Sequence, residues 1–334
     1  MNTLCVVGAG SIGRRHIENF SELFDRIDIV EPNAERAAEV LKSHPVNSAF
    51  ASFEEAIADT SYQAVAICAP PHVHLPIAEL AARSGSHLFI EKPLGMNVSG
   101  WNDLALYCEE KGIVSYVAYC HRHIPYTEVL KSIVQSGAIG RVIHGNMRWG
   151  SYLPDWHPWE DYRTFYMAKR EEGGGALMDE SHGIDIARYI LGEVTEVFAI
   201  VDTISDLEIS SDDTAFLTLR FENRSVLQIN FDLSSRCPRV SLEIIGTEGT
   251  VIWDRIAHEV RVFSASTKEW EERKYSKDDL MAMYPNQARH FYNCIVNGDK
   301  SIIDIRDAIK TQAVIDAGFE SSASGKLISV RSQG

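Results

Sequence analysis

The chain has 334 residues, a formal net charge of −15 and a hydrophobic fraction of 45%. The length predicts about two domains with a substantial core. The negative charge disfavours nucleic acid as a partner, because phosphate binding needs a basic surface. No apolar run approaches the ~18 residues of a membrane-spanning helix, and residues 1–10 lack the basic region and cleavage site of a signal peptide. We therefore expect a cytoplasmic protein with neither nucleic-acid nor membrane partners.

The cysteines are scattered along the chain and form no CxxC pair. They are Cys5, Cys68, Cys108, Cys120, Cys237 and Cys294. Several lie in apolar segments, so we expect buried free thiols in a reducing compartment rather than disulfides.

The first third of the chain alternates short apolar strands with amphipathic helices. We predict strands over residues 3–7, 27–30, 64–68, 87–90 and 114–119, and helices over residues 12–24, 34–43, 74–84 and 97–111. This alternation indicates βαβ units and a parallel sheet. Residues 1–122 are therefore predicted to form one α/β domain.

The pattern changes after residue 122. We predict a helix over residues 126–136 and strands over residues 141–150, 194–204, 214–221, 225–233, 240–245, 250–254 and 259–263. Helices return over residues 286–297 and 305–322, and the charged stretch 268–277 is expected to be a solvated hairpin rim. Period-two alternation between turns is typical of an antiparallel sheet with one half-buried face. Residues 123–334 are therefore predicted to form a second domain with an open, mainly antiparallel sheet.

The segment Gly8-Ala9-Gly10-Ser11-Ile12-Gly13 follows the first strand and opens the first helix. In that position the first glycine allows a tight turn, the second lets a pyrophosphate approach the backbone, and the third lets helix and strand pack closely. The helix N-terminus then faces the phosphates. This context predicts that the first domain is a Rossmann domain that binds a dinucleotide.

The acidic residue Glu31 ends the second predicted strand. A carboxylate at that place accepts hydrogen bonds from both ribose hydroxyls and repels a 2′-phosphate. The following Pro32 and Asn33 supply no compensating arginine. NAD is therefore the predicted cofactor, and NADP is less favoured.

The tripeptide Glu91-Lys92-Pro93 follows the strand predicted over residues 87–90. Lys92 is thereby placed at the carboxyl end of a parallel strand, where ligands bind in open α/β sheets. Its ammonium group could polarise a substrate hydroxyl or carbonyl there, and a cis Pro93 would fix the loop. A surface lysine that simply follows a strand is the alternative.

The segment 173–185 begins with three glycines, which let the backbone pass close to a ligand or to another chain segment. Asp179, His182 and Asp185 are spaced three apart, so on one helix they would share a face. A histidine whose second nitrogen is held by a carboxylate is a suitable base near neutral pH. A capped helix with an internally bonded histidine is the alternative.

Two further kinds of segment are candidates for function. Two histidine pairs occur, in His72-Val73-His74 and in His121-Arg122-His123. Neither pair has a carboxylate or cysteine at ligand spacing, so no metal is expected. Arg122 could contact an anion or the cofactor. A loop containing Trp156 and Arg163 suits sugar stacking and hydrogen bonds to hydroxyls, with a packed surface loop as the alternative.

In combination these segments resemble the Gfo/Idh/MocA family, named for glucose–fructose oxidoreductase, inositol dehydrogenase and a rhizopine catabolism protein. The resemblance covers nearly the whole chain and rests on GAGSIGRRH, ICAPPHVHLPIA, IEKPL, the HR at residue 122, GAIGRV, GGGALMDESHGIDIARYILG and IIGTEGTVIWD. It implies a Rossmann domain, a second domain with a large open antiparallel sheet, and homodimers or homotetramers formed through that sheet. Asp179 lies three residues before His182 rather than the usual four, so the spacing resembles the SH-x-x-D branch.

The resemblance also implies the roles of individual residues. His182 would take the hydroxyl proton as an alcohol becomes a ketone, Lys92 would stabilise the developing oxyanion, and Asp179 would assist His182. Expected cofactor contacts are Gly8, Gly10, Ser11, Ile12, Gly13, Glu31, Ala69, Pro70, His74, Glu91, Lys92 and Arg122. Expected substrate contacts are Lys92, Arg122, Trp156, Arg163, Asp179, His182 and Asp185.

The expected activity is NAD-dependent oxidation or reduction of a secondary hydroxyl or ketone in a sugar, amino sugar, nucleotide sugar or cyclitol. A glycosidase that oxidises its sugar transiently with NAD is one alternative, and it would form product without net NADH. A noncatalytic NAD(P)-binding regulator is another, and it would not need to keep Lys92 and His182.

Overall fold

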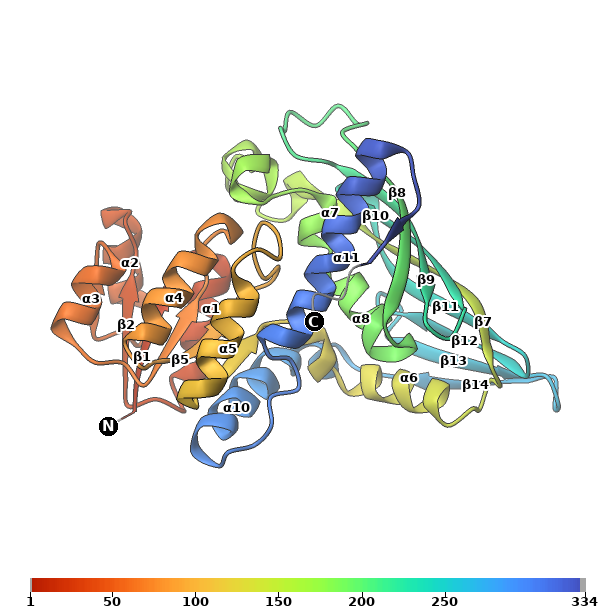
Figure 1. Ribbon diagram of the computed structural model, residues 1–334, viewed down its shortest axis with the longest axis horizontal. Helices are drawn as coiled ribbons and strands as arrows, with labels where there is room; N and C mark the ends of the chain where they lie inside the picture. Colours follow the sequence, from red (N-terminus) through yellow and green to blue (C-terminus); the bar gives the residue numbers. More distant parts are fainter. Residues whose placement is uncertain (1, 331–334) are drawn as a thin grey trace. The chain divides into compact units, whose positions relative to one another are not determined.

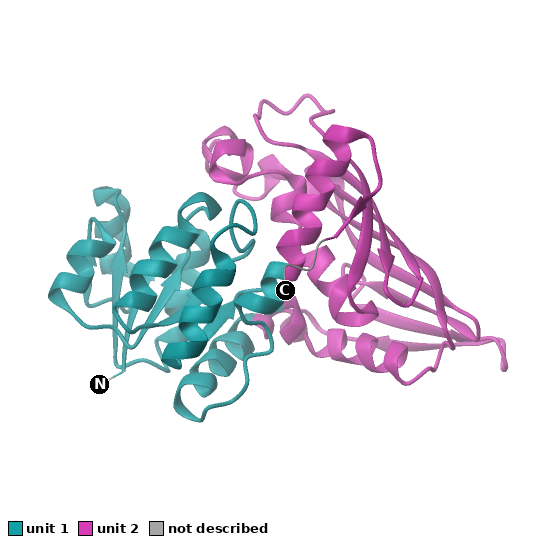
Figure 2. Ribbon diagram, in the orientation of Figure 1, with its two compact units in different colours: residues 1–120, 284–309 teal, residues 121–283, 310–334 magenta. Residues whose placement is uncertain are grey.

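The computed structural model describes residues 2–330, which divide into two compact units (Figure 2). Unit 1 comprises residues 1–120 and 284–309, and unit 2 comprises residues 121–283 together with the chain from residue 310. The sequence predicts two continuous domains that meet at residue 122, whereas residues 284–309 belong to unit 1. Ala288 and Phe291 explain this return, because both are buried in a core of unit 1.

Unit 1 is built on a parallel sheet in the order β3-β2-β1-β4-β5-β6. The strands are β1 (Thr3–Val7), β2 (Arg26–Val30), β3 (Ser48–Phe50), β4 (Ala64–Ile67), β5 (His87–Ile90) and β6 (Ser115–Val117). The strand order reverses between β1 and β4, and ligands bind at the carboxyl ends of strands beside such a reversal. The predicted Rossmann fold is confirmed.

Helices cover both faces of this sheet (Figure 1). They are α1 (Ser11–Phe20), α2 (Ala34–Ser43), α3 (Phe53–Asp59), α4 (His74–Arg83), α5 (Trp101–Lys111) and α10 (Met283–Val296). One core packs α1 and α10 against β5 through Phe20, Phe89 and Phe291. β3 and α3 were not predicted from the sequence, because elements this short carry little periodicity.

Unit 2 contains a sheet in the order β14-β13-β12-β11-β7-β10-β9-β8-β15. The strands are β7 (Val142–Tyr152), β8 (Val194–Asp202), β9 (Thr214–Phe221), β10 (Val226–Asp232), β11 (Ser234–Gly246), β12 (Gly249–Asp254), β13 (Glu259–Ser264), β14 (Glu269–Lys274) and β15 (Ile328–Ser329). β7 pairs in parallel with β10, and the other pairs are antiparallel. The predicted open, mainly antiparallel sheet is confirmed, with one parallel pair that the sequence did not indicate.

Helices of unit 2 pack on one face of this sheet (Figure 1). They are α6 (Pro125–Gln135), α7 (Ala176–Asp179), α8 (His182–Leu191) and the part of α11 (Ile305–Ser324) that follows residue 309. α9 (Lys277–Met281) is a short capped helix whose residues are not buried. α8 contacts the sheet closely, because a Cβ added at Gly183 would meet Phe231 of β10 and Met147 of β7. Side chains that point to the other face include Phe198 and Phe216, which are exposed.

The cysteines and the helices of both units bear on the predictions about disulfides and membrane spans. All six cysteines are free, and Cys237 on β11 is the one that is exposed. No helix within residues 2–330 is long and apolar enough to cross a membrane.

Candidate active site

The glycine turn between β1 and α1 has a different requirement at each glycine. Gly8 has φ +96°, and a Cβ there would lie 2.7 Å from the carbonyl oxygen of Cys68. A Cβ at Gly13 would overlap the carbonyl oxygen of Gly8, so close packing of helix and strand needs a glycine. A Cβ at Gly10 would meet no described atom within 4 Å, which leaves this side of the turn open to a ligand. The turn therefore has the form expected for a pyrophosphate site at a helix N-terminus.

Glu31 is held at the end of β2 beside this turn. Its carboxylate is 5% exposed and accepts hydrogen bonds from the backbone N–H groups of Ala9, at 3.1 Å, and Asn33, at 2.9 Å. Nη1 of Arg36, on the first turn of α2, lies 3.4 Å from both carboxylate oxygens. Arg36 lies beyond Pro32 and Asn33, the two residues from which no compensating arginine was predicted, and its place one helical turn further on brings it back to Glu31.

Lys92 follows β5 directly, in a loop whose first residue is anchored. The backbone N–H of Lys92 donates to Oε2 of Glu91 at 3.1 Å, and Oε1 of Glu91 lies 2.6 Å from Nε2 of His16 on α1. The Lys92–Pro93 peptide bond is cis, as expected. Lys92 itself is half-buried. Glu91 and Lys92 were predicted from the sequence, whereas His16 was not, because its only signal is its place one turn after Gly13.

His74 opens α4 and is fully buried. Its Nε2 lies 2.7 Å from the carbonyl oxygen of Ala69, and its Nδ1 lies 3.2 Å from the carbonyl oxygens of both Pro93 and Leu94. Burial lowers the pKa of His74, and hydrogen bonds to these carbonyls act in the opposite direction. The ring therefore connects the turn after β4 to the loop after Lys92, which suits an indirect role in cofactor binding better than direct contact.

The segment that carries Asp179 and His182 is not one continuous helix. α7 ends at Asp179 and α8 begins at His182, so the two residues flank a break at Glu180-Ser181. Asp179 is buried and its Oδ1 accepts a hydrogen bond of 2.7 Å from the hydroxyl of Tyr166. Asp179 and His182 therefore do not lie on one face of a single helix. The break between α7 and α8 and the hydrogen bond from Tyr166 determine where Asp179 lies.

Asp212 fixes the glycine turn before α7. Its Oδ2 accepts a hydrogen bond of 2.9 Å from the N–H of Leu177, and its carbonyl oxygen accepts one of 2.8 Å from the N–H of Ala176. Gly175 has φ +121°, and a Cβ there would overlap the Asp212 carboxylate. Burial raises the pKa of Asp212 to about 6, against hydrogen bonding from Leu177. A glycine at 175 is therefore required by both the backbone conformation and the buried carboxyl group.

His182 lies in an aromatic cluster at the start of α8. Its ring centroid is 4.4 Å from that of His121 and 6.1 Å from that of Trp149, to which it is nearly parallel at 17°. His121 and Trp149 are both buried, and their rings are 4.9 Å apart. Contacts between ring faces restrict the plane of the imidazole, so the cluster orients His182.

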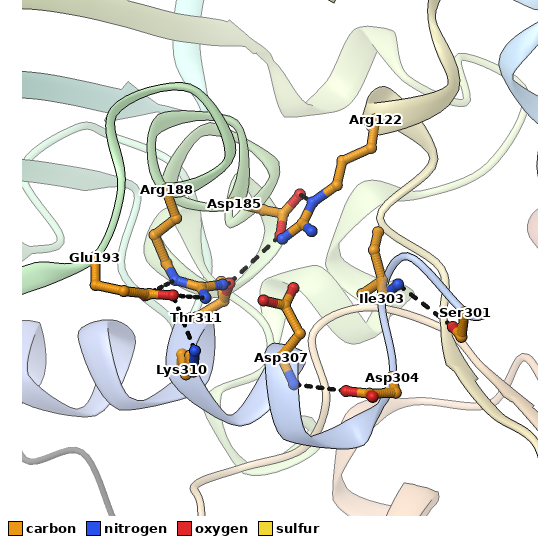
Figure 3. A network of polar contacts seen from close by, with 10 residues as sticks. All are labelled: Arg122, Asp185, Arg188, Glu193, Ser301, Ile303, Asp304, Asp307, Lys310 and Thr311. Atoms are coloured by element: carbon orange, nitrogen blue, oxygen red, sulfur yellow. Dashed lines mark hydrogen bonds and ion pairs between the residues drawn. The ribbon is translucent and has the colours of Figure 1, made fainter. Parts of the chain in front are cut away.

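Arg122 and Asp185 form a buried ion pair that joins the start of unit 2 to α8 (Figure 3). Nε of Arg122 donates to Oδ2 of Asp185 at 2.9 Å, and Nη2 donates to Oδ1 at 2.5 Å. Thr311 on α11 lies 3.5 Å from Oδ1 and accepts a hydrogen bond of 2.6 Å from Nη1 of Arg188. Both oxygens of Asp185 are thus occupied by protein donors. This pairing supports a role for Asp185 in orienting α8.

The aromatic loop between β7 and α7 holds its polar groups in local contacts. Nε1 of Trp156 donates to the hydroxyl of Ser151 at 2.6 Å. The guanidinium of Arg163 forms ion pairs with Asp161 and Glu208, at 2.9 Å and 2.6 Å. Hydrogen bonds from Arg163 lower the pKa of Asp161. Trp156 thereby has its indole nitrogen fixed, which leaves the ring faces as its means of contact.

Two family models match this chain. The family model described as an oxidoreductase family with an NAD-binding Rossmann fold matches residues 3–119, and the GFO/IDH/MocA C-terminal domain matches residues 127–252. The uncharacterised oxidoreductase YrbE of Bacillus subtilis is 30% identical over 264 residues, which cover 75% of this chain and 72% of YrbE. The chain belongs to the Gfo/Idh/MocA family.

Two other similar proteins have named activities. The myo-inositol 2-dehydrogenase of Thermotoga maritima is 29% identical over 261 residues, covering 75% of each chain. A solved structure of levoglucosan dehydrogenase in complex with NADH has a TM-score of 0.87 and 24% identity, and the match covers 99% of each chain. The Gfo/Idh/MocA fold therefore extends over both units.

Membership in the Gfo/Idh/MocA family confirms that the protein is an oxidoreductase with NAD as its cofactor. The residues of unit 1 fit this cofactor. The open side of Gly10 leaves room for the pyrophosphate, and the buried carboxylate of Glu31 suits ribose hydroxyls, because a carboxylate has about four lone-pair sites and can accept further hydrogen bonds.

Several residues that contact the candidate site were not predicted from the sequence. They are His16, Arg36, Trp149, Tyr166 and Asp212, whereas His121 was named only within a histidine pair. His16, Arg36, Trp149 and Tyr166 each contact a residue that was named, and Asp212 instead holds the backbone of Ala176 and Leu177 in α7. Most of these pairs are far apart in sequence. Arg36, on the helix after Glu31, and His16, one turn after Gly13, are the two whose positions carry a local signal.

Proposed function

We propose that this oxidoreductase interconverts a secondary hydroxyl and a ketone in a sugar, amino sugar, nucleotide sugar or cyclitol. The observation that carries the proposal is the anchored loop of Lys92, which lies at the carboxyl end of β5 in the unit that contains the dinucleotide turn. A lysine that follows a strand by chance needs no buried carboxylate to hold its backbone. The names of the two relatives, a cyclitol dehydrogenase and an anhydrosugar dehydrogenase, support the substrate class.

The chemistry divides between the two residues that the family resemblance assigns. NAD⁺, held by the glycine turn and Glu31, would supply the acceptor for the hydride of the carbon that bears the hydroxyl. His182 takes the hydroxyl proton, and the ammonium group of Lys92 stabilises the charge that develops on the oxygen. Tyr166 holds Asp179, so Asp179 enters the proposal as a positioned carboxylate in the same segment as His182.

Substrate contacts are proposed at Trp156, whose ring faces suit a sugar ring, and at Arg163 and Arg122. The carboxylates that bind Arg163 are exposed, so a polar substrate can compete for its guanidinium. Arg122 instead has a buried partner, Asp185. We propose that Arg122 contacts the cofactor or the substrate while it remains paired with Asp185.

A substrate panel with NAD⁺ tests the proposal. The purified protein is mixed with levoglucosan, myo-inositol, other monosaccharides and nucleotide sugars, and NADH formation is followed by absorbance. We expect at least one of them to give NADH. Glycoside cleavage without net NADH would instead indicate the transient-oxidation glycosidase, and NAD binding with neither product would indicate a regulator.

Variants of the two proposed catalytic residues complete this test. We expect Lys92→Ala and His182→Asn each to lower turnover by ~10²-fold or more, the scale for losing an acid–base or electrostatic group. Affinity for NAD⁺, measured by calorimetry, should change little. Turnover at the wild-type level in Lys92→Ala would refute the catalytic role of Lys92.

We also infer that the protein is a homodimer or homotetramer that associates through the open face of the unit 2 sheet. Phe198, Ile200 and Phe216 on β8 and β9 are 40%, 53% and 45% exposed, and Ile200 lies directly opposite Phe216. Neighbouring exposed apolar side chains of this size are typical of an interaction surface. A second copy of the chain, as the family resemblance implies, is the proposed occupant.

A further inference from the structure

A buried carboxylate–imidazole pair joins the helix after the dinucleotide turn to the loop of Lys92. His16 lies on α1, and its Nε2 is 2.6 Å from Oε1 of Glu91. The exposed fractions of the two side chains are 0% and 10%. In the tautomer that carries the proton on Nε2, His16 donates this hydrogen bond to the Glu91 carboxyl oxygen.

The second oxygen of Glu91 continues the connection to Lys92. Oε2 accepts the backbone N–H of Lys92 at 3.1 Å, and the backbone N–H of Glu91 donates to the carbonyl oxygen of Ile67 at 2.9 Å. The main chain of Glu91 is therefore fixed to β4, while its side chain spans from α1 to the first residue of the loop. The position of Lys92 thus depends on His16 through one intervening carboxylate.

We propose that His16 and Glu91 are positioning residues that hold Lys92 in the orientation in which it acts. The inference rests on the proposed function, which gives Lys92 the charge-stabilising role. α1 is also the helix whose N-terminus is expected to face the cofactor phosphates, so one helix sets the position of both the cofactor and the lysine. Displacing a reacting group by about 1 Å costs on the order of 10²-fold in rate. Loss of the anchor should therefore lower the rate measurably.

The geometry defines which replacements keep the anchor. His16→Gln retains an N–H donor that can reach Glu91, whereas His16→Met fills a similar apolar volume without a donor. Glu91→Gln offers one oxygen and one NH₂ group to two N–H donors, so it can satisfy only one of them. His290→Met is the matched control, because His290 contacts Tyr116, which stacks on the same Phe89 ring that His16 contacts.

A spectroscopic measurement tests the anchor without any substrate. The lysines of the intact protein are reductively methylated with ¹³C-formaldehyde, and the Lys92 signal is assigned by its loss in Lys92→Arg. We expect a distinct signal in the wild type, in His16→Gln and in His290→Met, and a shift toward the signals of exposed lysines in His16→Met and Glu91→Gln. An unchanged Lys92 signal in a folded His16→Met or Glu91→Gln protein would overturn the proposal.

A double-variant cycle then tests whether the anchor acts through Lys92. With the substrate that gives the fastest NADH formation in the panel, we expect His16→Met to lower kcat by 10- to 100-fold and to change the KM for NAD⁺ by less than about threefold. In a Lys92→Ala background the same change should cause no further loss, because the side chain that it would aim is gone. Equal losses in both backgrounds would overturn the positioning role, whereas a fully active Lys92→Ala protein would refute the proposed function itself. If His16→Met does not fold, Glu91→Gln takes its place in the cycle.

Discussion

The guanidinium of Arg122 and the carboxylate of Asp185 form two parallel hydrogen bonds, at 2.9 Å and 2.5 Å, in a site where the side chains are 5% and 0% exposed. The guanidinium also lies 4.8 Å from the ring centroid of Tyr189, measured from Cζ. A pair in this geometry specifies one arrangement of α8 relative to the turn at Arg122. Since α8 begins at His182, the same pair helps to set the position of the proposed base.

Removing one member of this pair should be costly. We expect Asp185→Asn or Arg122→Met to lower the free energy of unfolding by ~3–5 kcal/mol, because each leaves the opposite charge buried without its partner. Urea unfolding of the variants and the wild type measures the difference. The double variant Arg122→Met/Asp185→Leu should regain much of the loss, because neither charge of the pair is then left buried without its partner. A raised KM in Asp185→Asn with unchanged unfolding would indicate direct substrate contact instead.

The contact between Glu31 and Arg36 gives a prediction about cofactor choice. We expect Glu31→Ser to lower the ratio of NAD⁺ affinity to NADP⁺ affinity by roughly tenfold or more, the equivalent of ~1.4 kcal/mol. The substitution removes a carboxylate that repels the 2′-phosphate, and it leaves Arg36 to face that phosphate. Calorimetric titration with each cofactor measures the two dissociation constants.

The control for this prediction is Glu31→Ser/Arg36→Ala. If Arg36 supplies the new phosphate contact, the double variant should lose most of the gain in NADP⁺ affinity. An affinity ratio that stays at the wild-type value in Glu31→Ser would remove Glu31 from the ribose site.

Features encoded in a short stretch of sequence were predicted, and contacts between distant segments were not. The Rossmann strands and the glycine turn are encoded within short windows, so the fold of unit 1 and its cofactor were predicted correctly. The pairs His16–Glu91 and Asp212–Leu177 join segments far apart in sequence, and neither member of a pair carries a mark of its partner. The return of residues 284–309 to unit 1 was missed for the same reason. Periodicity predicts that α10 is a helix but not which sheet it covers.

The exposed side chains on β8 and β9 give a prediction about assembly. We expect Phe216→Glu to shift the protein toward monomer, because a carboxylate placed opposite Ile200 would have to be buried in the proposed interface. Size-exclusion chromatography with light scattering measures the mass in solution. Thr218 lies two residues further along β9, on the same face of the sheet and opposite Phe198. If the interface extends this far, Thr218→Glu should also shift the protein toward monomer. A wild-type protein that is monomeric would contradict the inferred assembly.

Asp212 and Asp213 are adjacent buried carboxyl groups whose pKa values move in opposite directions. Burial raises the pKa of Asp212 to about 6. Burial also acts to raise the pKa of Asp213, but hydrogen bonds from Ile204 and Ser205 outweigh it and lower that pKa below its ordinary value. The two residues should therefore contribute to stability with opposite dependence on pH.

The sign for Asp212 follows from its raised pKa in the folded state. The folded protein binds the proton more tightly than the unfolded chain, so the favourable contribution is complete below about pH 4 and is lost as the pH rises through about 6. We expect Asp212→Asn, which is neutral at every pH and can still accept from Leu177, to be more stable than the wild type by on the order of 2–3 kcal/mol at pH 7. That difference should shrink toward zero at pH 4.

Asp213→Asn should behave oppositely, destabilising the protein at pH 7 and losing this effect as the pH falls. Urea midpoints measured for both variants between pH 4 and pH 8 test the pair, and an Asp212→Asn protein no more stable than wild type at pH 7 would contradict the assignment.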